Sequence, residues 1–268
     1  MDQGDAVVEG EYGAKGTEQL ETIWGEGFMS PGGPAEVGRI LKGADVAGAA
    51  ALDIGCGTGG AAFVLANDHG AASVTGVDVE PYVIDRASQR AVALEVAERV
   101  RFATVQPGPL PFADASFDLV FSKDALIHVQ DKRSLYAEAY RVLRPGGWLC
   151  VGDWLRGDGA DLDADVEAFS GEEFFMQSLA ELGELVSSTG FVEIELEDRR
   201  EWYHEEAKTE LARLRGPLQN TFGSRLGQEM FDHTAKFWEG LVESTRKGVL
   251  RPGHVRARRP TQGFLQTS

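Results

Sequence analysis

The sequence feature that most constrains the fold is a glycine-rich stretch at residues 53–60, Asp-Ile-Gly-Cys-Gly-Thr-Gly-Gly. The apolar residues 50–54 lead into it and predict a buried strand, and we expect a helix from its end to about His69. A strand, a glycine turn and a helix in this order place a ligand at the carboxyl edge of a parallel sheet. Gly55 and Gly57 let the backbone touch that ligand because they carry no Cβ. Such a loop alone also fits an ordinary tight turn or a dinucleotide site.

Two aspartates beside this loop narrow the choice of ligand. Asp53 precedes the first loop glycine by two positions, where its carboxylate can hold an amino group directly or through water. Asp78 ends the next predicted strand, residues 73–78, and is placed to accept hydrogen bonds from both hydroxyls of a ribose. The sequence shows no further signature of a nicotinamide or of a second phosphate. A nicotinamide-dependent dehydrogenase is therefore the least favoured interpretation.

Strand and helix patterns alternate along the chain. Strands are expected at residues 50–54, 73–78, 100–105, 117–122, 148–154, 192–196 and 248–258. Helices are expected after the glycine loop and at residues 14–27, 35–43, 81–95, 131–143, 174–189 and most of 200–247. This alternation predicts an α/β fold with a central, mostly parallel sheet of about seven strands and helices on both faces.

We expect one domain over residues 1–268, because no linker-like boundary interrupts the sequence. Its expected parts are N-terminal lid helices (1–45), a ligand-binding core (46–199), a helical insertion on the substrate side (200–247) and a last strand with a tail (248–268). The aromatic residues of the insertion fit either a packed core or a pocket for an ammonium group, which ring faces attract. They are Trp202, Tyr203, Phe222, Phe231, Phe237 and Trp238.

Charge and cysteine content exclude several classes of function. The chain has 26 Lys and Arg against 43 Asp and Glu, a formal charge of −17, which disfavours nucleic acid and anionic membranes as partners. No apolar run is long enough to cross a membrane and the start of the sequence has no secretory signal pattern, so we expect a cytoplasmic protein. Its two cysteines cannot build a disulfide framework, and no Cys/His spacing fits zinc, so no metal is expected. What remains is a protein that binds a small molecule, with no obligate protein partner evident.

A candidate catalytic pair follows the fourth predicted strand, in the motif Ser122-Lys-Asp-Ala-Leu-Ile-His128. Asp124 and His128 are four residues apart, so a helical turn would put them on one face at the carboxyl edge of the sheet. The unperturbed pKa of histidine lies close to neutral, which suits it to act as a general base that Asp124 orients. The alternative is a histidine packed under the next helix.

The glycine loop and its downstream acid are accompanied by Leu-Pro-Phe before the fourth strand and Leu-Arg-Pro-Gly-Gly before the fifth. Over residues 50–154 this set resembles the class I S-adenosylmethionine (SAM)-dependent methyltransferases. The resemblance implies a Rossmann-like sheet with SAM as cofactor, in which the loop contacts the methionine part and Asp78 the ribose. It also implies that the residue after the third strand, often an Asp in the family, meets the adenine. Here Gln106 takes that place, followed by Pro107.

Three further elements belong together: Tyr12, the stretch Trp-Gly-Glu-Gly-Phe-Met-Ser-Pro-Gly-Gly at residues 24–33, and the motif that ends in His128. They are similar to elements of the phosphoethanolamine N-methyltransferases. This resemblance implies that Tyr12 and His128 pair, close the site and handle the proton of an amine, with Asp124 as the family's acid. It also implies a set of residues beside the cofactor, in which a lysine replaces an arginine: Met29, Ser30, Val79, Ser122 and Lys123.

The chain departs from that family at the phosphate pocket. Glu172 falls near the position of a phosphate-gripping arginine and Leu241 near that of a lysine, while Trp154 and Phe174 stand where the family has tyrosines. We therefore expect methyl transfer to the nitrogen of a small amine bound by Trp154, Phe174 and Glu172, with the phosphate of the family's substrate in doubt. The open alternatives are a sarcosine or dimethylglycine (betaine-forming) N-methyltransferase, an S-methyltransferase for a small thioether, and a SAM-binding protein without catalysis.

Overall fold

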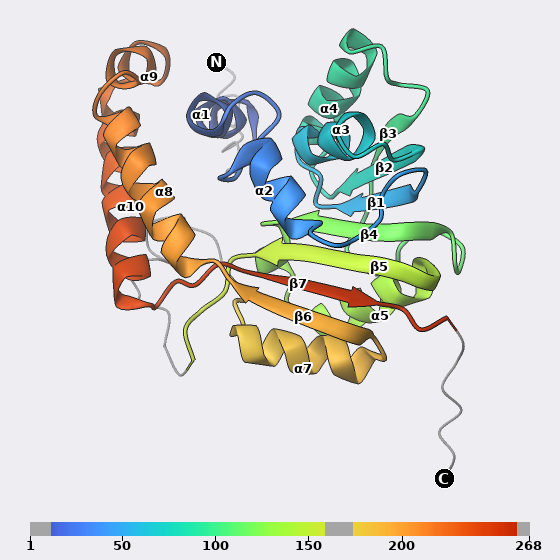
Figure 1. Ribbon diagram of the computed structural model, residues 1–268. Coiled ribbons are helices and arrows are strands. Elements are labelled where there is room, and N and C mark those ends of the chain that lie inside the picture. Colours follow the sequence, from blue (N-terminus) through green and yellow to red (C-terminus); the bar gives the residue numbers. More distant parts are fainter. Residues whose placement is uncertain (1–11, 159–173, 262–268) are drawn as a thin grey trace, which may run out of the picture.

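The computed structural model describes residues 12–158 and 174–261. Within these ranges lies a seven-stranded sheet with the order β3-β2-β1-β4-β5-β7-β6 (Figure 1). The strands are β1 (Ala50–Ile54), β2 (Ser73–Asp78), β3 (Val100–Thr104), β4 (Phe117–Lys123), β5 (Leu143–Asp153), β6 (Val192–Asp198) and β7 (Gly253–Arg258). Strands β1 to β5 are parallel, whereas β7 pairs antiparallel with both β5 and β6. The expected, mostly parallel sheet is confirmed, and the last strand lies inside it.

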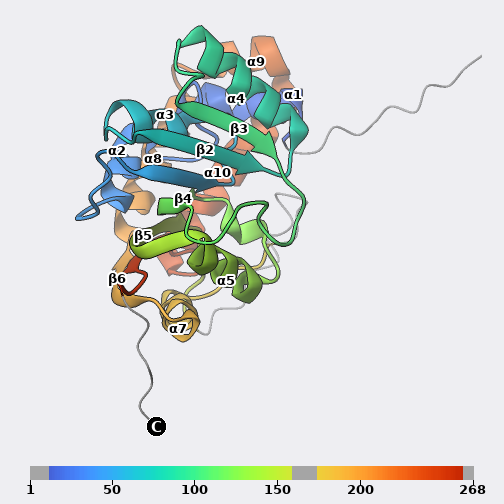
Figure 2. The ribbon, with the colours of Figure 1, turned by 90° about the vertical axis from the view of Figure 1, so that its right-hand side faces the viewer.

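Helices cover both faces of the sheet. In the core they are α2 (Gly33–Ile40), α3 (Gly60–Asn67), α4 (Pro81–Ala93), α5 (Lys132–Val142) and α7 (Leu179–Thr189). Figure 2 shows α2 and α3 on one side of the strands and α5 on the other. Alternate side chains of one strand point to opposite faces of the sheet. In β4, Leu119 and Phe121 pack with α2 and α3, and Val120 packs with α5 and α7. Burial on both faces explains why this strand is apolar without interruption.

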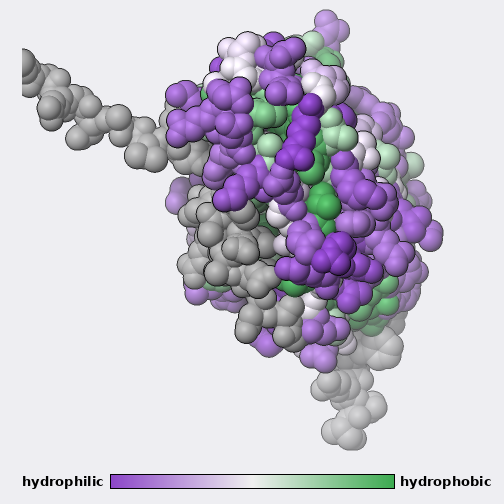
Figure 3. All heavy atoms as spheres, turned by 90° about the vertical axis from the view of Figure 1, so that its left-hand side faces the viewer, coloured by the Kyte–Doolittle hydropathy of each residue, from purple (hydrophilic) through white to green (hydrophobic). Residues whose placement is uncertain are grey.

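The C-terminal helical block lies beyond the carboxyl end of β5 (Figure 1). It consists of α8 (Arg200–Leu214), α9 (Gln219–Leu226) and α10 (Gln228–Lys247), and α1 (Ala14–Trp24) packs against it. Its interior holds the fully buried rings of Tyr203, Phe222 and Trp238, so packing accounts for these aromatics. The outer face of the block is mostly hydrophilic, with a narrow strip of hydrophobic side chains (Figure 3).

One buried carboxylate joins α1 to this block. Glu210 of α8 accepts hydrogen bonds from the indole N–H groups of Trp24 (2.5 Å) and Trp238 (2.9 Å). Burial raises the pKa of Glu210 to about 7, although the two indole bonds lower it. The N-terminal helix is therefore held against the C-terminal helical block by polar as well as apolar contacts.

Two expected elements begin later in the chain than the sequence pattern indicated. The helix expected from residue 174 begins at Leu179, because Ser178 caps it and Glu181 bonds back to the Ser178 N–H in a capping box. The strand expected from residue 248 begins at Gly253, since Gly248 ends α10 in the left-handed conformation.

Candidate active site

The glycine loop turns at the carboxyl end of β1 and passes against β2. Gly55 has φ +71°, and a Cβ there would lie 2.2 Å from the Cβ of Ala125, so the position requires glycine. The N–H of Gly55 donates to the carbonyl of Val77 (2.8 Å), and the N–H of Gly57 donates to Oδ2 of Asp78 (2.9 Å). The loop thus lies between β2 and the segment after β4 that carries the candidate catalytic residues.

Asp53 is a buried carboxyl group with an unused oxygen. The residue is 1% exposed, and its Oδ2 has no hydrogen-bond partner in the described structure. Burial raises the pKa of Asp53 to about 7; nearby Asp78 raises it further, and Lys123 opposes the shift. A buried carboxyl group in this state gains most from a cationic hydrogen-bond donor, because such a donor satisfies the free oxygen and stabilises the charge. The amino group of an amino-acid ligand is a donor of this kind.

Asp78 stands on the other side of the loop. Its Oδ2 accepts the bond from Gly57, and its Oδ1 accepts one from the N–H of Glu80 (3.1 Å). Each carboxylate oxygen can accept more than one hydrogen bond, so both can still accept from ribose hydroxyls. Further along the same edge of the sheet, Val79 is 47% exposed, and Gln106 and Pro107 are exposed beyond the end of β3.

A partly buried carboxylate on α1 fastens the N-terminal segment to the glycine loop. Glu21 accepts hydrogen bonds from the N–H of Gly27 (2.9 Å) and the hydroxyl of Thr58 (2.7 Å), and it pairs with Arg86 (3.0 Å) and Arg90 (3.1 Å). Arg90 also donates to the carbonyl of Thr58 (2.8 Å). Burial alone would raise the pKa of Glu21, but the bonds from Thr58, Gly27 and Arg90 outweigh it and lower that pKa. No local sequence pattern predicts this cluster of contacts, because its residues come from separate elements.

The segment after α1 brings two more expected residues to the site. A Cβ on Gly57 would lie 2.9 Å from Cε of Met29, so Met29 rests directly on the loop. Lys123, at the end of β4, donates to the hydroxyl of Ser30 and forms an ion pair with Asp124 (2.7 Å). The lysine that stands in the family's arginine position therefore ties the N-terminal segment to the sheet edge.

Tyr12 and His128 lie in contact although 116 residues separate them. The Tyr12 hydroxyl and Nε2 of His128 are 2.8 Å apart, and their rings meet edge to face with centroids 5.6 Å apart. The ring of Phe174 lies 5.5 Å from that of His128, between centroids. Tyr12 precedes α1, and its carbonyl accepts a hydrogen bond from the hydroxyl of Thr17 (3.2 Å). The pair therefore connects the N-terminal segment to the loop after β4.

The prediction that a helical turn places Asp124 and His128 on one face is wrong. Asp124 has φ +55°, outside the helical range, and only the short 3₁₀ turn η1 (Leu126–His128) follows. Asp124 is held by Lys123, as described above, and His128 by Tyr12. The hydroxyl of Ser122, expected beside the cofactor, is fully buried and donates to the carbonyl of Ile54 (2.7 Å), where it joins β4 to β1.

Of the expected substrate residues, two fall within the described structure. Trp154 follows β5, and its ring meets that of Tyr203 edge to face at 4.7 Å between centroids. Phe174 lies beside His128, whereas Glu172 lies outside the described residues. Leu241, expected near the position of the family's lysine, is buried among the apolar residues of the helical block.

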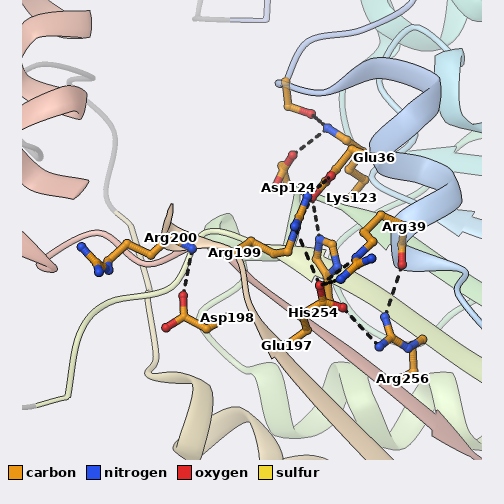
Figure 4. A network of polar contacts seen from close by, with 11 residues as sticks. Glu36, Arg39, Lys123, Asp124, Glu197, Asp198, Arg199, Arg200, His254 and Arg256 are labelled. Atoms are coloured by element: carbon orange, nitrogen blue, oxygen red, sulfur yellow. Dashed lines mark hydrogen bonds and ion pairs between the residues drawn. The ribbon is translucent and has the colours of Figure 1, made fainter. Parts of the chain in front are cut away.

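A buried ionic network lies beside the end of β4 (Figure 4). Glu36 of α2 accepts two hydrogen bonds from Arg199 (3.0 and 2.7 Å) and forms an ion pair with Nε2 of His254 at 2.9 Å. Burial opposes ionisation of Glu36, but the bonds from His254 and Arg199 prevail and lower its pKa to about 2. Sequence reasoning missed this network, because its three residues are up to 218 positions apart and match no local pattern.

The residues that the structure describes include no His/Cys/Asp/Glu cluster that could hold a metal ion. In the same part of the chain, no helix is long and apolar enough to span a membrane.

Comparisons with known proteins agree with this geometry. Residues 52–151 match the family model described as a methyltransferase domain. A phosphoethanolamine N-methyltransferase of Triticum aestivum is 26% identical over 244 residues, which are 91% of this chain and 48% of that protein. A structure of Haemonchus contortus phosphoethanolamine N-methyltransferase 2, in complex with phosphomonomethylethanolamine and S-adenosylhomocysteine, superposes with a TM-score of 0.87 at 29% identity. It covers 93% of this chain and 59% of its own.

The chain therefore has the class I SAM-dependent methyltransferase fold. A putative sarcosine dimethylglycine methyltransferase from Galdieria sulphuraria shares this fold, with a TM-score of 0.80 at 20% identity over 94% of this chain and 100% of its own. The chain spans about half the length of the curated relatives it matches. The residues present fit SAM as the cofactor: the free oxygen of Asp53 suits its amino group, Asp78 its ribose, and the glycine loop leaves room for close approach.

Proposed function

We propose that this protein transfers a methyl group from SAM to the nitrogen of a small amine. The observation that carries the proposal is the contact between Tyr12 and His128, which sets a proton-accepting ring at the sheet edge beside the cofactor loop. SAM, when bound, supplies an electrophilic methyl group on a sulfonium. The relatives named as phosphoethanolamine N-methyltransferases support the choice of nitrogen as the acceptor atom.

The protein's main contribution to such a transfer is alignment of the nucleophile with the methyl carbon. Holding reactants in line can supply roughly 7–11 kcal/mol of the barrier reduction. The N-terminal segment has the contacts needed for this, because Glu21 fixes it to the glycine loop and Tyr12 fixes it to His128. Closure of the N-terminal segment over the site also excludes water from the reacting groups.

An amine must lose a proton before it can attack, because an ammonium nitrogen has no free electron pair. Alkylammonium groups titrate far above neutral, near about 10.4 for Lys. His128 accepts that proton, directly or through water, and the Tyr12 hydroxyl holds the imidazole ring in place. Asp124, at the same edge, attracts the cationic amine before the proton leaves.

The test is turnover of His128→Ala and Tyr12→Phe on a panel of ethanolamine, phosphoethanolamine, glycine, sarcosine, dimethylglycine and small thioethers. For an amine acceptor, His128→Ala should lower kcat by roughly 10²–10⁴, the range for a positioned acid–base group. Tyr12→Phe should cost less, since it keeps the ring and loses one hydrogen bond. The matched control is His233→Ala, an exposed histidine on α10.

Affinity for S-adenosylhomocysteine (SAH) should stay within about twofold in His128→Ala, because the ring acts on the acceptor side. Near-full turnover of His128→Ala on an amine would refute the base assignment. Turnover restricted to a thioether, which has no proton to lose, would refute the choice of nitrogen and favour S-methylation. Dimethylglycine as the preferred acceptor would leave the chemistry in place and identify a betaine-forming enzyme.

A further inference from the structure

The candidate base His128 stands on a turn of only three residues, η1 (Leu126–His128). The N–H of His128 reaches the carbonyl of Ala125 over 3.4 Å, and the N–H of Val129 reaches that of Leu126 over 2.9 Å. Hydrogen bonds in a 3₁₀ turn have poorer geometry than those of an α-helix, so a single turn is weakly held by itself. The place of the His128 ring therefore depends on the groups that hold this turn from outside.

Lys132 holds the carbonyl groups on either side of His128. It lies in the first turn of α5, and its side chain is buried. Its ammonium group donates to the carbonyl of Leu126 and to that of Val129 (3.2 Å). Because these two carbonyls precede and follow His128 in the chain, one side chain fixes the backbone on both sides of the base.

The burial of Lys132 has an energetic cost that packing alone does not explain. Desolvation lowers the pKa of Lys132, and the charge of Asp153 opposes that shift. A methionine would fill a similar space without this cost, but it has no N–H group to donate to a carbonyl. The cost is therefore consistent with a role that needs a hydrogen-bond donor at this place.

Asp153 holds the same turn from the sheet. It is the buried last residue of β5, and its Oδ1 accepts a hydrogen bond from the N–H of Ile127 (3.2 Å). The carbonyl of Ile127 accepts a second bond, from the N–H of Phe175 (2.8 Å). Both backbone polar groups of the residue before His128 are thus occupied by partners outside the turn.

The elements that carry these two groups are firmly packed. Strand β5 lies between β4 and β7, and the buried face of α5 packs on the sheet. From the other side, the Tyr12 hydroxyl lies 2.8 Å from Nε2 of His128. The ring is therefore held at its tip by the N-terminal segment and at its backbone by Lys132 and Asp153. When the N-terminal segment opens to admit ligands, the second hold remains.

We propose that Lys132 and Asp153 are positioning residues that act through His128, by fixing the turn on which the base stands. This inference rests on the proposed function and deepens it, since neither residue has a role there. Its physical reason is the steep dependence of reactivity on geometry: a displacement of about 1 Å can lower a rate by about 100-fold. Groups on packed helices and strands maintain such a position better than groups on loops.

The first test is a double-mutant cycle between Lys132→Met and His128→Ala, with turnover measured on the amines of the panel named above. Lys132→Met alone should lower kcat by about 10- to 100-fold and leave the Kd for SAH within about twofold. In the His128→Ala background it should lower kcat by less than about twofold, because residues that act as a unit are not additive. A merely structural role predicts the same loss in both backgrounds.

The matched control is Lys208→Met, at an exposed lysine of α8 that pairs with Glu205, and it should leave kcat unchanged. A second pair of variants tests the other contact. Asp153→Asn keeps an oxygen that can accept from Ile127 and should retain kcat within about threefold. Asp153→Leu has no acceptor and should lose about tenfold or more. The Tm of each variant is measured alongside.

The second test observes the His128 ring without turnover, by NMR of protein labelled with ¹³C-histidine and saturated with SAH. The chain has five histidines, and the ring signal that is missing in His128→Ala identifies His128. Lys132→Met should shift or split this signal, because the turn beneath the ring is released. Lys208→Met should leave the same signal unmoved.

The outcomes separate this inference from the proposed function. An unmoved His128 signal in Lys132→Met, or an equal loss of kcat in both backgrounds, overturns the positioning role and leaves N-methylation in place. Wild-type kcat in Lys132→Met and Asp153→Leu, on an amine whose turnover needs His128, overturns it as well. If His128→Ala turns amines over like the wild type but Lys132→Met still moves the ring signal, the base assignment falls and the hold on the ring stands.

Discussion

The buried carboxyl group of Asp53 makes cofactor affinity depend on pH in a direction that the structure determines. Its pKa is raised to about 7 in the ligand-free protein, chiefly by burial, so at pH 6 only about one molecule in ten carries the charge that pairs with the ligand's ammonium. Binding of that ammonium favours the ionised form. Affinity should therefore rise with pH through about 7 and level off above it.

The expected size of this pH effect on affinity follows from the ionised fraction of Asp53. If only the ionised form binds tightly, the Kd for SAH should be about tenfold higher at pH 6 than at pH 8. Binding near pH 6.5 should also release a proton, which calorimetry in buffers of different ionisation enthalpy measures directly. SAH is preferred to SAM because it lacks the sulfonium charge that acidifies the nearby amino group.

Asp53→Asn is the decisive variant, because it keeps the shape of the side chain and removes the titration. It should bind SAH more weakly at pH 8, with a nearly flat pH profile and little proton release. In the ligand-free protein, the contribution of Asp53 to the stability of the fold changes with pH in the opposite direction to the affinity. Between about pH 4 and pH 7 the folded state keeps a proton that the unfolded state has lost, so this group's contribution to stability falls as the pH rises. A wild-type affinity that does not change between pH 6 and pH 8, or the same profile in Asp53→Asn, would refute the reasoning.

Other predictions concern the glycine loop and the N-terminal segment of residues 12–33. Asp78→Ala should weaken SAM binding at least about tenfold, because it removes an acceptor for the ribose and the bond from Gly57; unchanged affinity by calorimetry would contradict the assigned site. Glu21→Gln should weaken SAM binding by about 1–2 kcal/mol and speed hydrogen exchange over residues 12–33, whereas exposed Glu18→Gln on the same helix should do neither. In the wild type, SAH should slow exchange in the same segment; identical exchange with and without it would mean that the segment is static packing.

The sequence predicted the parts of this molecule that depend on local pattern. The apolar residues of β1, the glycines after it and the acid that ends β2 are read from a short stretch of chain, and the structure places them together. The contact of Tyr12 with His128 was expected from the family resemblance and could not be derived from spacing, since 116 residues separate the two.

The remaining features depend on contacts between residues that are far apart in the sequence. Glu36, Arg199 and His254 belong to a helix, the start of another helix and the last strand, and none carries a local signal of its partners. The positive φ of Asp124 ruled out the helical turn, and a single residue of this kind is not visible in a hydrophobic pattern. The capping box at Ser178 and Glu181 did have a sequence signature, a Ser followed three positions later by a Glu, and it would have placed the start of α7 correctly.

The position of β7 has a consequence for biosynthesis. The strand formed by Gly253–Arg258 lies between β5 and β6, so β5 and β6 lack this shared partner until residues 253–258 have left the ribosome. Until then the outer edge of β5 offers unpaired backbone groups, and a nascent chain in this state is prone to join another copy. His254, and with it the ionic network that includes Glu36 and Arg199, arrives with the same strand. That network is therefore completed only after the glycine loop and the parallel strands β1 to β5 have been synthesised.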